Sequence, residues 1–295
     1  MRCACIDIGS NTTRLLVVEP TRHGLAIVRQ ERVFLPLSGI DRGGVARRRA
    51  GALIRAVERL AALAAADGVA AGSVQAVATQ ALRVLPDDQR EQLLAQLSAA
   101  AGAGVELLST EREAELAFRG ATAGADPRSG PVAVVDVGGG PTEVVVGVPG
   151  AVPLWWYSAP LGSRGLTERC LPSDPPTASE LGAAATVATE QLAPATAAPA
   201  VERVLTVGGG TQSLARLLDG RPADERLLGD VLRVLTTAGS RTIAARHDID
   251  DRRARTLPAA LVLLVAAVAP LGRPVEPGAG GVREGLLLER LAREQ

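Results

Sequence analysis

Two stretches of the chain repeat one pattern, in which two apolar runs flank a turn of small residues. Residues 3–6 lead into Asp7-Ile-Gly-Ser-Asn-Thr-Thr-Arg-Leu-Leu-Val-Val, and residues 132–135 lead into Asp136-Val-Gly-Gly-Gly-Pro-Thr-Glu-Val-Val-Val-Gly. β-Branched and apolar residues on both flanks are typical of paired strands. Superposed, the stretches match at Asp7 with Asp136, Gly9 with Gly138, and Thr13 with Thr142. The pattern predicts two strand–turn–strand units and an internally duplicated chain.

Between the two hairpins the pattern alternates between strand and helix periods. Apolar residues at helical spacing predict a helix over residues 42–67, whose core face would carry Leu53, Val57, Leu60 and Leu63. Further predicted segments are strands at 24–28, 31–35, 74–78 and 105–108 and helices at 87–101 and 110–119. The turn-rich stretch 120–130 then predicts a domain boundary, which divides the chain into residues 1–125 and 126–295.

In the second half, helices predominate after the hairpin. Trp155-Trp156-Tyr157 is expected to close a sheet edge, and residues 161–164 and 173–177 form a Pro-rich connection. The remaining predicted segments are a strand at 201–207 and helices from 178 and at 212–218, 225–246, 251–269 and 282–290. We leave open that the final helix, about 282–295, packs back on the first domain.

The two turns suit a phosphate group. Residues with small side chains let backbone N–H groups converge on an anion, and Ser and Thr add hydroxyl donors. An Asp directly before such a turn would repel phosphate, so it implies an intervening cation, most naturally Mg²⁺ held through waters. A Gly-rich hairpin whose Asp makes only a turn hydrogen bond is the alternative. Because the same Asp offset occurs twice, we favour the phosphate site.

Charge and composition exclude other classes. The 295 residues include 32 basic and 32 acidic ones, so no global field directs the protein to nucleic acid or to a membrane surface. The most apolar segment, 257–269, is shorter than the about 20 residues that span a bilayer. No signal peptide is recognised at the N-terminus. We therefore expect a soluble protein of the cytoplasm.

Cysteine and histidine offer little material for a metal or nucleophile site. Cys3, Cys5 and Cys170 have no metal-ligand spacing, and a reducing compartment fits them. His23 and His247 are far apart and flanked by polar residues, so both are expected at the surface rather than in a triad.

Other candidate residues follow strands. Arg83 comes after the strand 74–78, at the end where open α/β sheets bind ligands, and is a candidate phosphate contact. Thr110 and Glu113 have the spacing of a capping box, which is the structural interpretation of Glu113. Gly208-Gly209-Gly210-Thr211 follows a strand and opens a helix, where N–H groups could face an anion or a nucleotide.

Taken together, these segments resemble the exopolyphosphatase and guanosine pentaphosphate phosphohydrolase family, a branch of the actin-like superfamily. The resemblance covers nearly the whole chain. Its motifs are Asp7-Ile-Gly-Ser-Asn-Thr-Thr-Arg14, Thr79-Gln-Ala-Leu-Arg83, Ser109-Thr-Glu-Arg-Glu113-Ala, Asp136-Val-Gly-Gly-Gly-Pro-Thr-Glu143, Ser173-Asp-Pro-Pro-Thr177, Gly208-Gly-Gly-Thr211 and Gly281-Val-Arg-Glu-Gly285. The resemblance implies an α/β fold of two ribonuclease-H-like domains with an interdomain cleft, in the short form without an extra helical domain.

The resemblance also implies site roles. Glu113 would be the catalytic base, with Mg²⁺ as cofactor held by Asp7, Asp136 and Glu143. The residues implied to bind substrate are Ser10, Asn11, Arg14, Arg83, Gly138, Gly139, Gly140, Thr142, Gly209 and Thr211. Inorganic polyphosphate or a guanosine pentaphosphate would be the partner, and a homodimer is left open.

Several positions depart from the family pattern. Phe34-Leu35-Pro36 stands for Arg-Leu-Gly, Glu115 for Arg, Pro141 for Ser, and Asp87 for an Asn. Arg164 is shifted by one place before Gly165. Because phosphate donors are lost, a catalytically weak polyphosphate or alarmone binder is the alternative to the leading hypothesis, an exopolyphosphatase that prefers long polyphosphate. A sugar-kinase-type phosphotransferase is disfavoured because no second substrate site is legible.

Overall fold

The chain folds into two compact α/β units. The structure is a computed structural model that describes all residues except 23, 38–42, 219 and 295, and it leaves out the side chains at 43–46, 211, 212, 215 and 294. The first unit comprises residues Met1–Gly120 and Val282–Gln295, and the second comprises Ala121–Gly281. Relative to the division at 125/126, residues 121–125 cluster with the second unit and the C-terminal helix with the first.

A five-stranded mixed sheet forms the centre of the first unit. Its strands are β1 (Cys3–Ile8), β2 (Thr12–Thr21), β3 (Gly24–Phe34), β4 (Val74–Ala78) and β5 (Val105–Leu107). Their order in the sheet is β3-β2-β1-β4-β5. The pairs β1–β2 and β2–β3 are antiparallel, and β1–β4 and β4–β5 are parallel. The two segments predicted at 24–28 and 31–35 are therefore one continuous strand.

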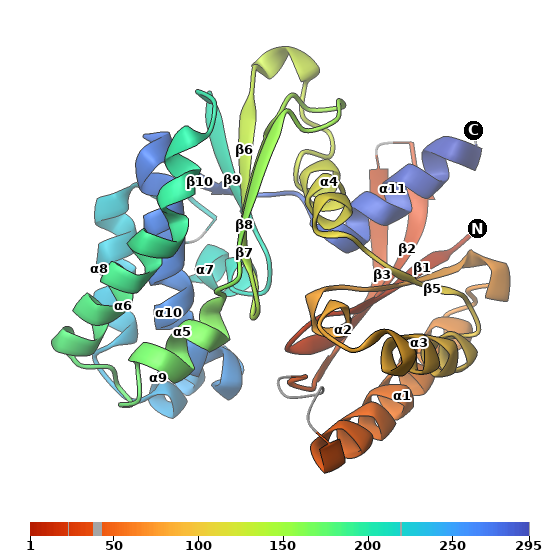
Figure 1. Ribbon diagram of the computed structural model, residues 1–295. Helices are drawn as coiled ribbons and strands as arrows, with labels where there is room; N and C mark the ends of the chain where they lie inside the picture. The colour runs from red at the N-terminus through yellow and green to blue at the C-terminus, as the bar shows by residue number, and fades with distance from the viewer. Residues whose placement is uncertain (23, 38–42, 219, 295) are drawn as a thin grey trace. The chain divides into compact units, whose positions relative to one another are not determined.

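Helices cover both faces of this sheet. Helices α1 (Gly43–Ala66) and α3 (Asp87–Ala101) pack with Ala4, Ile6 and Ile8 of β1. On the other face, α4 (Thr110–Ala121) and α11 (Val282–Glu294) pack with Cys3 and Cys5 (Figure 1). Two single turns, η1 (Ala71–Ser73) and α2 (Gln80–Arg83), flank β4. Alternate residues of β1 thus face different helix pairs, as the period of two requires.

The second unit repeats this sheet. Its strands are β6 (Val132–Val137), β7 (Thr142–Gly147), β8 (Trp155–Ala159), β9 (Arg203–Val207) and β10 (Val275–Pro277). Their order is β10-β9-β6-β7-β8, which, counted within the unit, is the order of the first sheet. The β6–β7 and β7–β8 pairs are antiparallel and the other two are parallel, again as in the first unit. The predicted duplication and the ribonuclease-H-like fold class are therefore confirmed, and β8 lies at a sheet edge, as its aromatic residues suggested.

The helices of the second unit gather on one side of its sheet (Figure 1). They are α5 (Ser163–Cys170), α6 (Ala178–Leu192), α7 (Thr211–Leu217), α8 (Glu225–Leu235), α9 (Ser240–His247) and α10 (Asp251–Val268), with short turns η2 (Pro127–Ser129), η3 (Ala193–Ala197) and η4 (Ala269–Leu271). Helix α10 contacts α5, α6, α8, α9 and β6, so it is the core helix of this unit.

Helix α10 also changes the membrane argument. With η4 it forms the segment Asp251–Leu271, which is long and apolar enough to span a membrane by length and composition, with a mean hydropathy of 1.9. The argument that 257–269 is too short is therefore wrong, because the helix begins at Asp251. However, 61% of this window is buried inside the structure, as is usual for a core helix. The cytoplasmic location stays a prediction.

Several predicted boundaries are wrong. Helix α5 was expected as a connection, and β10 was expected as part of an all-helical end. The helix predicted at 225–246 is two helices, α8 and α9, because Gly239 interrupts the segment and occupies the N-cap position of α9. The Asp174 carboxylate accepts hydrogen bonds from the Ser240 N–H and hydroxyl at 2.8 and 2.7 Å and so fixes the start of α9.

Candidate functional site

In the first unit, three loops meet at the carboxyl edge of the parallel strands. The Thr79 N–H donates to the carbonyl of Ile8 at 3.2 Å, so the loop after β4 is joined to the end of β1. The Leu108 N–H donates to the carbonyl of Ala78 at 2.9 Å, which joins the loop after β5 to the end of β4. This is the edge where open α/β sheets bind ligands. It carries the first Gly turn, Arg83 and Glu113.

The first turn is closed by its own backbone. The Gly9 N–H donates to the carbonyl of Thr12 at 3.0 Å. The carbonyls of Asn11 and Ser10 accept from the N–H groups of Leu35 and Leu37 at 3.1 and 2.9 Å. Three hydrogen bonds thus fix the predicted substrate-binding segment, and the Arg14 Nε donates to the Thr12 hydroxyl at 3.1 Å. Arg14 is therefore tied to the turn that it was predicted to serve.

Asp7 lies opposite Arg14 in the β1–β2 register. Burial raises the pKa of the Asp7 carboxyl, while the Arg14 and Arg283 guanidinium groups act in the lowering direction and Glu284 adds to the rise. Arg283 and Glu284 come from the start of α11, with 3.5 Å between Arg283 Nη2 and Glu284 Oε1. The sequence motif Gly281-Val-Arg-Glu-Gly285 had been noted without a role. The structure places its charged residues in the electrostatic environment of Asp7.

Glu113 is held by Arg83. The Arg83 Nη1 donates to Glu113 Oε2 at 3.0 Å and to the Leu108 carbonyl at 2.7 Å. Glu113 is buried, with 9% of the residue exposed. The capping box with Thr110 is wrong, because Thr110 is the first helical residue and the Ser109 hydroxyl accepts from the Arg112 N–H at 3.1 Å. The Glu113 carboxylate accepts from Arg83, and Ser109 rather than Thr110 stands at the N-cap position.

The second turn repeats the first and has its own support. The Gly138 N–H donates to the carbonyl of Pro141 at 3.0 Å, at the position that Thr12 has in the first turn. The Ser163 N–H and hydroxyl both donate to the Gly138 carbonyl, at 2.9 and 3.1 Å. Gly139 and Gly140 are half-buried. Ser163, at the start of the unpredicted α5, is therefore a supporting residue that the sequence did not reveal.

Thr142 differs from its predicted role. The residue is fully buried, and its hydroxyl donates to the Leu161 carbonyl at 2.8 Å. A hydroxyl that is enclosed and already donates to the backbone holds the turn together. We therefore assign Thr142 to the support of the second turn rather than to direct phosphate contact.

Asp136 and Glu143 form a pair of acidic residues. They are directly opposite each other in the antiparallel β6–β7 register, where side chains share one face. Gly208, at φ +93°, lies against Asp136, since a Cβ on it would meet Asp136 Oδ1 at 2.3 Å. Gly208 therefore lets the turn between β9 and α7 approach Asp136.

Two further candidate residues, Gly209 and Thr211, lie where the turn after β9 leads into α7. Gly209 is half-buried in the turn before α7, and Thr211 is the first residue of α7, but its side chain lies outside the described residues. Within the described part of the chain, no three His, Cys, Asp or Glu side chains are grouped to hold a metal ion. Asp136 and Glu143 are adjacent, whereas Asp7 belongs to the other unit. The joint metal role of these three, like the cleft between the domains, stays a prediction.

Comparison with known sequences gives a consistent family. The model described as the Ppx/GppA phosphatase family matches residues 17–294. Exopolyphosphatase 2 of Mycobacterium tuberculosis is 38% identical over 209 residues, which cover 66% of this chain and 62% of that protein. Exopolyphosphatase 1 of Mycobacterium bovis is 29% identical over 315 residues, covering 100% of this chain and 89% of that one. The chain thus spans less than two thirds of the length of the first of these relatives.

Solved structures agree with the fold. The Ppx/GppA family member of Aquifex aeolicus superposes with a TM-score of 0.80 at 26% identity, covering 100% of this chain and 99% of that chain. An exopolyphosphatase of Cytophaga hutchinsonii superposes with a TM-score of 0.83 at 20% identity, covering 99% of this chain and 98% of that chain. The second likeness concerns the fold alone.

Proposed function

Because the chain belongs to the Ppx/GppA phosphatase family, we propose that it is an exopolyphosphatase that releases the terminal orthophosphate of inorganic polyphosphate. The observation that carries the proposal is the duplicated strand–turn–strand, in which each turn follows an Asp and is closed by the same N–H to carbonyl bond. Backbone N–H groups at such turns suit phosphate oxygens. The names of the relatives support the substrate class.

Glu113 is the base in this reaction. Its carboxylate takes a proton from a water molecule as the water oxygen attacks the terminal phosphorus, and the bond to the bridging oxygen breaks. The shortened polyphosphate leaves with the electron pair of that bond. Arg83 orients the Glu113 carboxylate through the 3.0 Å hydrogen bond. Arg14 and the N–H groups of the first turn stabilise the charge that spreads over the transferred group.

The acidic pair of the second unit fits Mg²⁺. Asp136 and Glu143 offer carboxylate oxygens from two adjacent strands, where like charges directly opposite repel each other and a cation would lower the repulsion. Mg²⁺ prefers one or two carboxylates plus waters and substrate phosphates, so two acidic residues are sufficient. When bound, Mg²⁺ would supply Lewis-acid stabilisation of phosphoryl oxygens. Asp7 is the predicted third acidic residue.

Phosphate release from long-chain polyphosphate in the presence of Mg²⁺ tests this proposal. Wild type and Glu113→Gln are compared, and Gln is expected to lower turnover by about two orders of magnitude or more, since general-base catalysis contributes that much. Polyphosphate binding should persist, because Gln keeps the shape of the side chain. A Glu113→Gln variant with wild-type turnover would show that Glu113 is not the base.

Pro141 favours a second candidate, a catalytically weak binder of polyphosphate or of a guanosine alarmone. Proline has no N–H, so the second turn has one donor fewer than a turn with Ser or Thr at that position. Release from polyphosphate, ATP and guanosine pentaphosphate at two ionic strengths separates the candidates. We expect the fastest release from polyphosphate and binding that weakens with salt, because many screened contacts hold a phosphate chain. Faster release from guanosine pentaphosphate would favour an alarmone hydrolase.

A further inference from the structure

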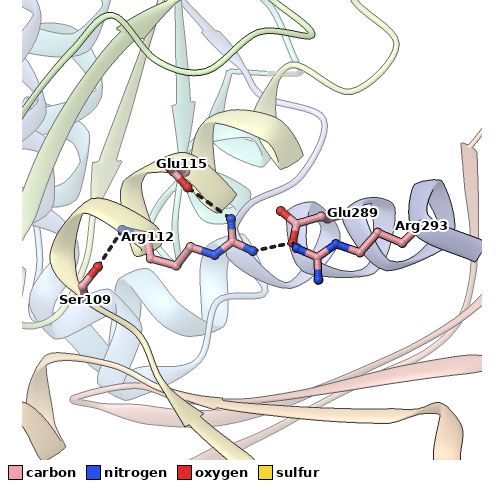
Figure 2. Close-up of polar contacts among 5 residues, drawn as sticks. All are labelled: Ser109, Arg112, Glu115, Glu289 and Arg293. Carbon is pink, nitrogen blue, oxygen red and sulfur yellow. Dashed lines mark hydrogen bonds and ion pairs between the residues drawn. The ribbon is translucent and has the colours of Figure 1, made fainter.

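Helix α11 ties the C-terminal end of the chain to α4, the helix that carries Glu113. In the first unit, Arg112 Nη2 donates to Glu289 Oε1 at 2.5 Å, and Arg112 Nη1 donates to Glu115 at 3.1 Å. Figure 2 shows the Arg112 guanidinium between Glu115 of its own helix and Glu289 of α11. Arg112 is the neighbour of Glu113 in the sequence, so the contact acts on the same helical turn.

The two helices also touch through their backbones. A Cβ on Gly285 would lie 1.9 Å from the carbonyl oxygen of Leu116 and 3.1 Å from the N atom of Gly120. No side chain fits there, so α11 passes α4 at backbone contact distance. Leu116 is one helical turn after Glu113. The position of this part of α4 is therefore set by α11 and by the sheet together.

Two ion pairs then hold successive residues of α4 from different directions. Glu113 is bound by Arg83 after β4, and Arg112 is bound by Glu289. Adjacent residues on a helix point about 100° apart, so the two contacts together fix the rotation of α4 about its axis. The side chains of Glu289 and Arg112 are 12% and 26% exposed, so solvent screens this pair less than a surface pair.

Given the proposed role of Glu113 as base, we propose that Glu289 is a positioning residue, which orients Glu113 by holding Arg112 in place. Glu289 does not meet the substrate in this role. Its loss should leave substrate affinity unchanged and misalign the base. A base that is misplaced by 1 Å can cost about a hundredfold in rate, so a partial displacement costs less.

Glu289→Gln tests the proposal, with Arg290→Gln as the matched control. Arg290 is the next residue of α11, and its Nη2 donates to the Gly72 carbonyl at 2.8 Å, so its replacement removes a contact of α11 that lies outside α4. In phosphate release from long-chain polyphosphate with Mg²⁺, Glu289→Gln should lower kcat roughly five- to fiftyfold, with KM within about twofold. Arg290→Gln should change kcat less than about twofold.

Hydrogen exchange supplies a readout independent of activity. Amides of residues 109–121 should exchange faster in Glu289→Gln than in wild type, and not in Arg290→Gln. If Glu289→Gln does not fold, Arg112→Met removes the same pair from α4 and carries the same expectations. Equal losses in Glu289→Gln and Arg290→Gln would overturn the positioning role in favour of general docking of α11. If wild type releases no phosphate, the proposed function is overturned. Hydrogen exchange of the amides of residues 109–121 in the variants would still decide whether Glu289 holds α4.

Discussion

We expect Gly208→Ala to destabilise the protein through two effects, the backbone strain of a positive φ and the overpacking of a methyl group against Asp136. Gly208 has φ +93°, and a Cβ there would lie 2.3 Å from Asp136 Oδ1 and 3.1 Å from the Val137 carbonyl oxygen. The left-handed conformation costs an L-residue about 1–2 kcal/mol. Overpacking adds about 1–3 kcal/mol, so the expected loss in the free energy of unfolding is about 2–5 kcal/mol.

Gly272→Ala is the matched control. Gly272 belongs to the same unit and has φ +62°, but a Cβ there would meet no atom within 4 Å. It should therefore lose only the about 1–2 kcal/mol of backbone strain. The difference between the two variants measures the approach of the turn to Asp136.

Urea unfolding and phosphate release provide the two measurements. If the Asp136 carboxylate moves away from the new methyl group, Gly208→Ala should lose little more stability than Gly272→Ala. Phosphate release should then decrease, because Asp136 is displaced from Glu143. Activity is measured at a temperature where both variants are folded. A Gly208→Ala variant that equals Gly272→Ala in both stability and phosphate release would refute the assignment of Gly208 to the Asp136 site.

Three further predictions concern single contacts. Arg83→Met should lower kcat more than it raises KM, because Arg83 binds Glu113; a rise in KM alone would assign Arg83 to the substrate instead. Asp136→Ala, or EDTA added to wild type, should abolish phosphate release, whereas Asp126→Ala, which removes an exposed cap of η2, should keep it. The third prediction concerns pH, because Arg112 holds the pKa of Glu289 below its ordinary value. The stability from this pair is therefore present above about pH 4.3 and is lost as the pH falls through the lowered pKa. In urea unfolding at pH 7, 5, 4 and 3, wild type should lose more stability than Glu289→Gln.

The elements with strong local signals were predictable from sequence. Both hairpins have apolar runs around a small-residue turn. Helix α3 begins after Pro86 and ends before Gly102, which adopts the left-handed conformation. The failures have local causes too. Helix α5 is short, mostly polar and interrupted by Gly165, and β10 has three residues and ends in Pro277. Neither gives a periodic pattern long enough to detect.

The site was predictable only in part. Turn residues such as Gly9 and Gly138 are recognised because their neighbours in sequence are their neighbours in space. The partners of Glu113 and Asp7 are not, since Arg83 is thirty residues from Glu113 and Arg283 lies at the other end of the chain from Asp7. The N-cap was assigned one residue too late because Ser109 and Thr110 both carry hydroxyl groups, and only the contact with the Arg112 N–H distinguishes them.

The residue opposite the Asp differs between the duplicated turns, and this difference has a chemical consequence. In the first unit the residue opposite the Asp is Arg14, and in the second it is Glu143. A guanidinium opposite an Asp favours its charged form, whereas two carboxylates directly opposite on a sheet repel each other. The proposed function uses this difference, with Arg14 at phosphate oxygens in the first unit and the two carboxylates at Mg²⁺ in the second. If Mg²⁺ binds there as proposed, we expect its removal to alter the stability of the second unit more than that of the first, because the ion would offset the repulsion within the like-charge pair.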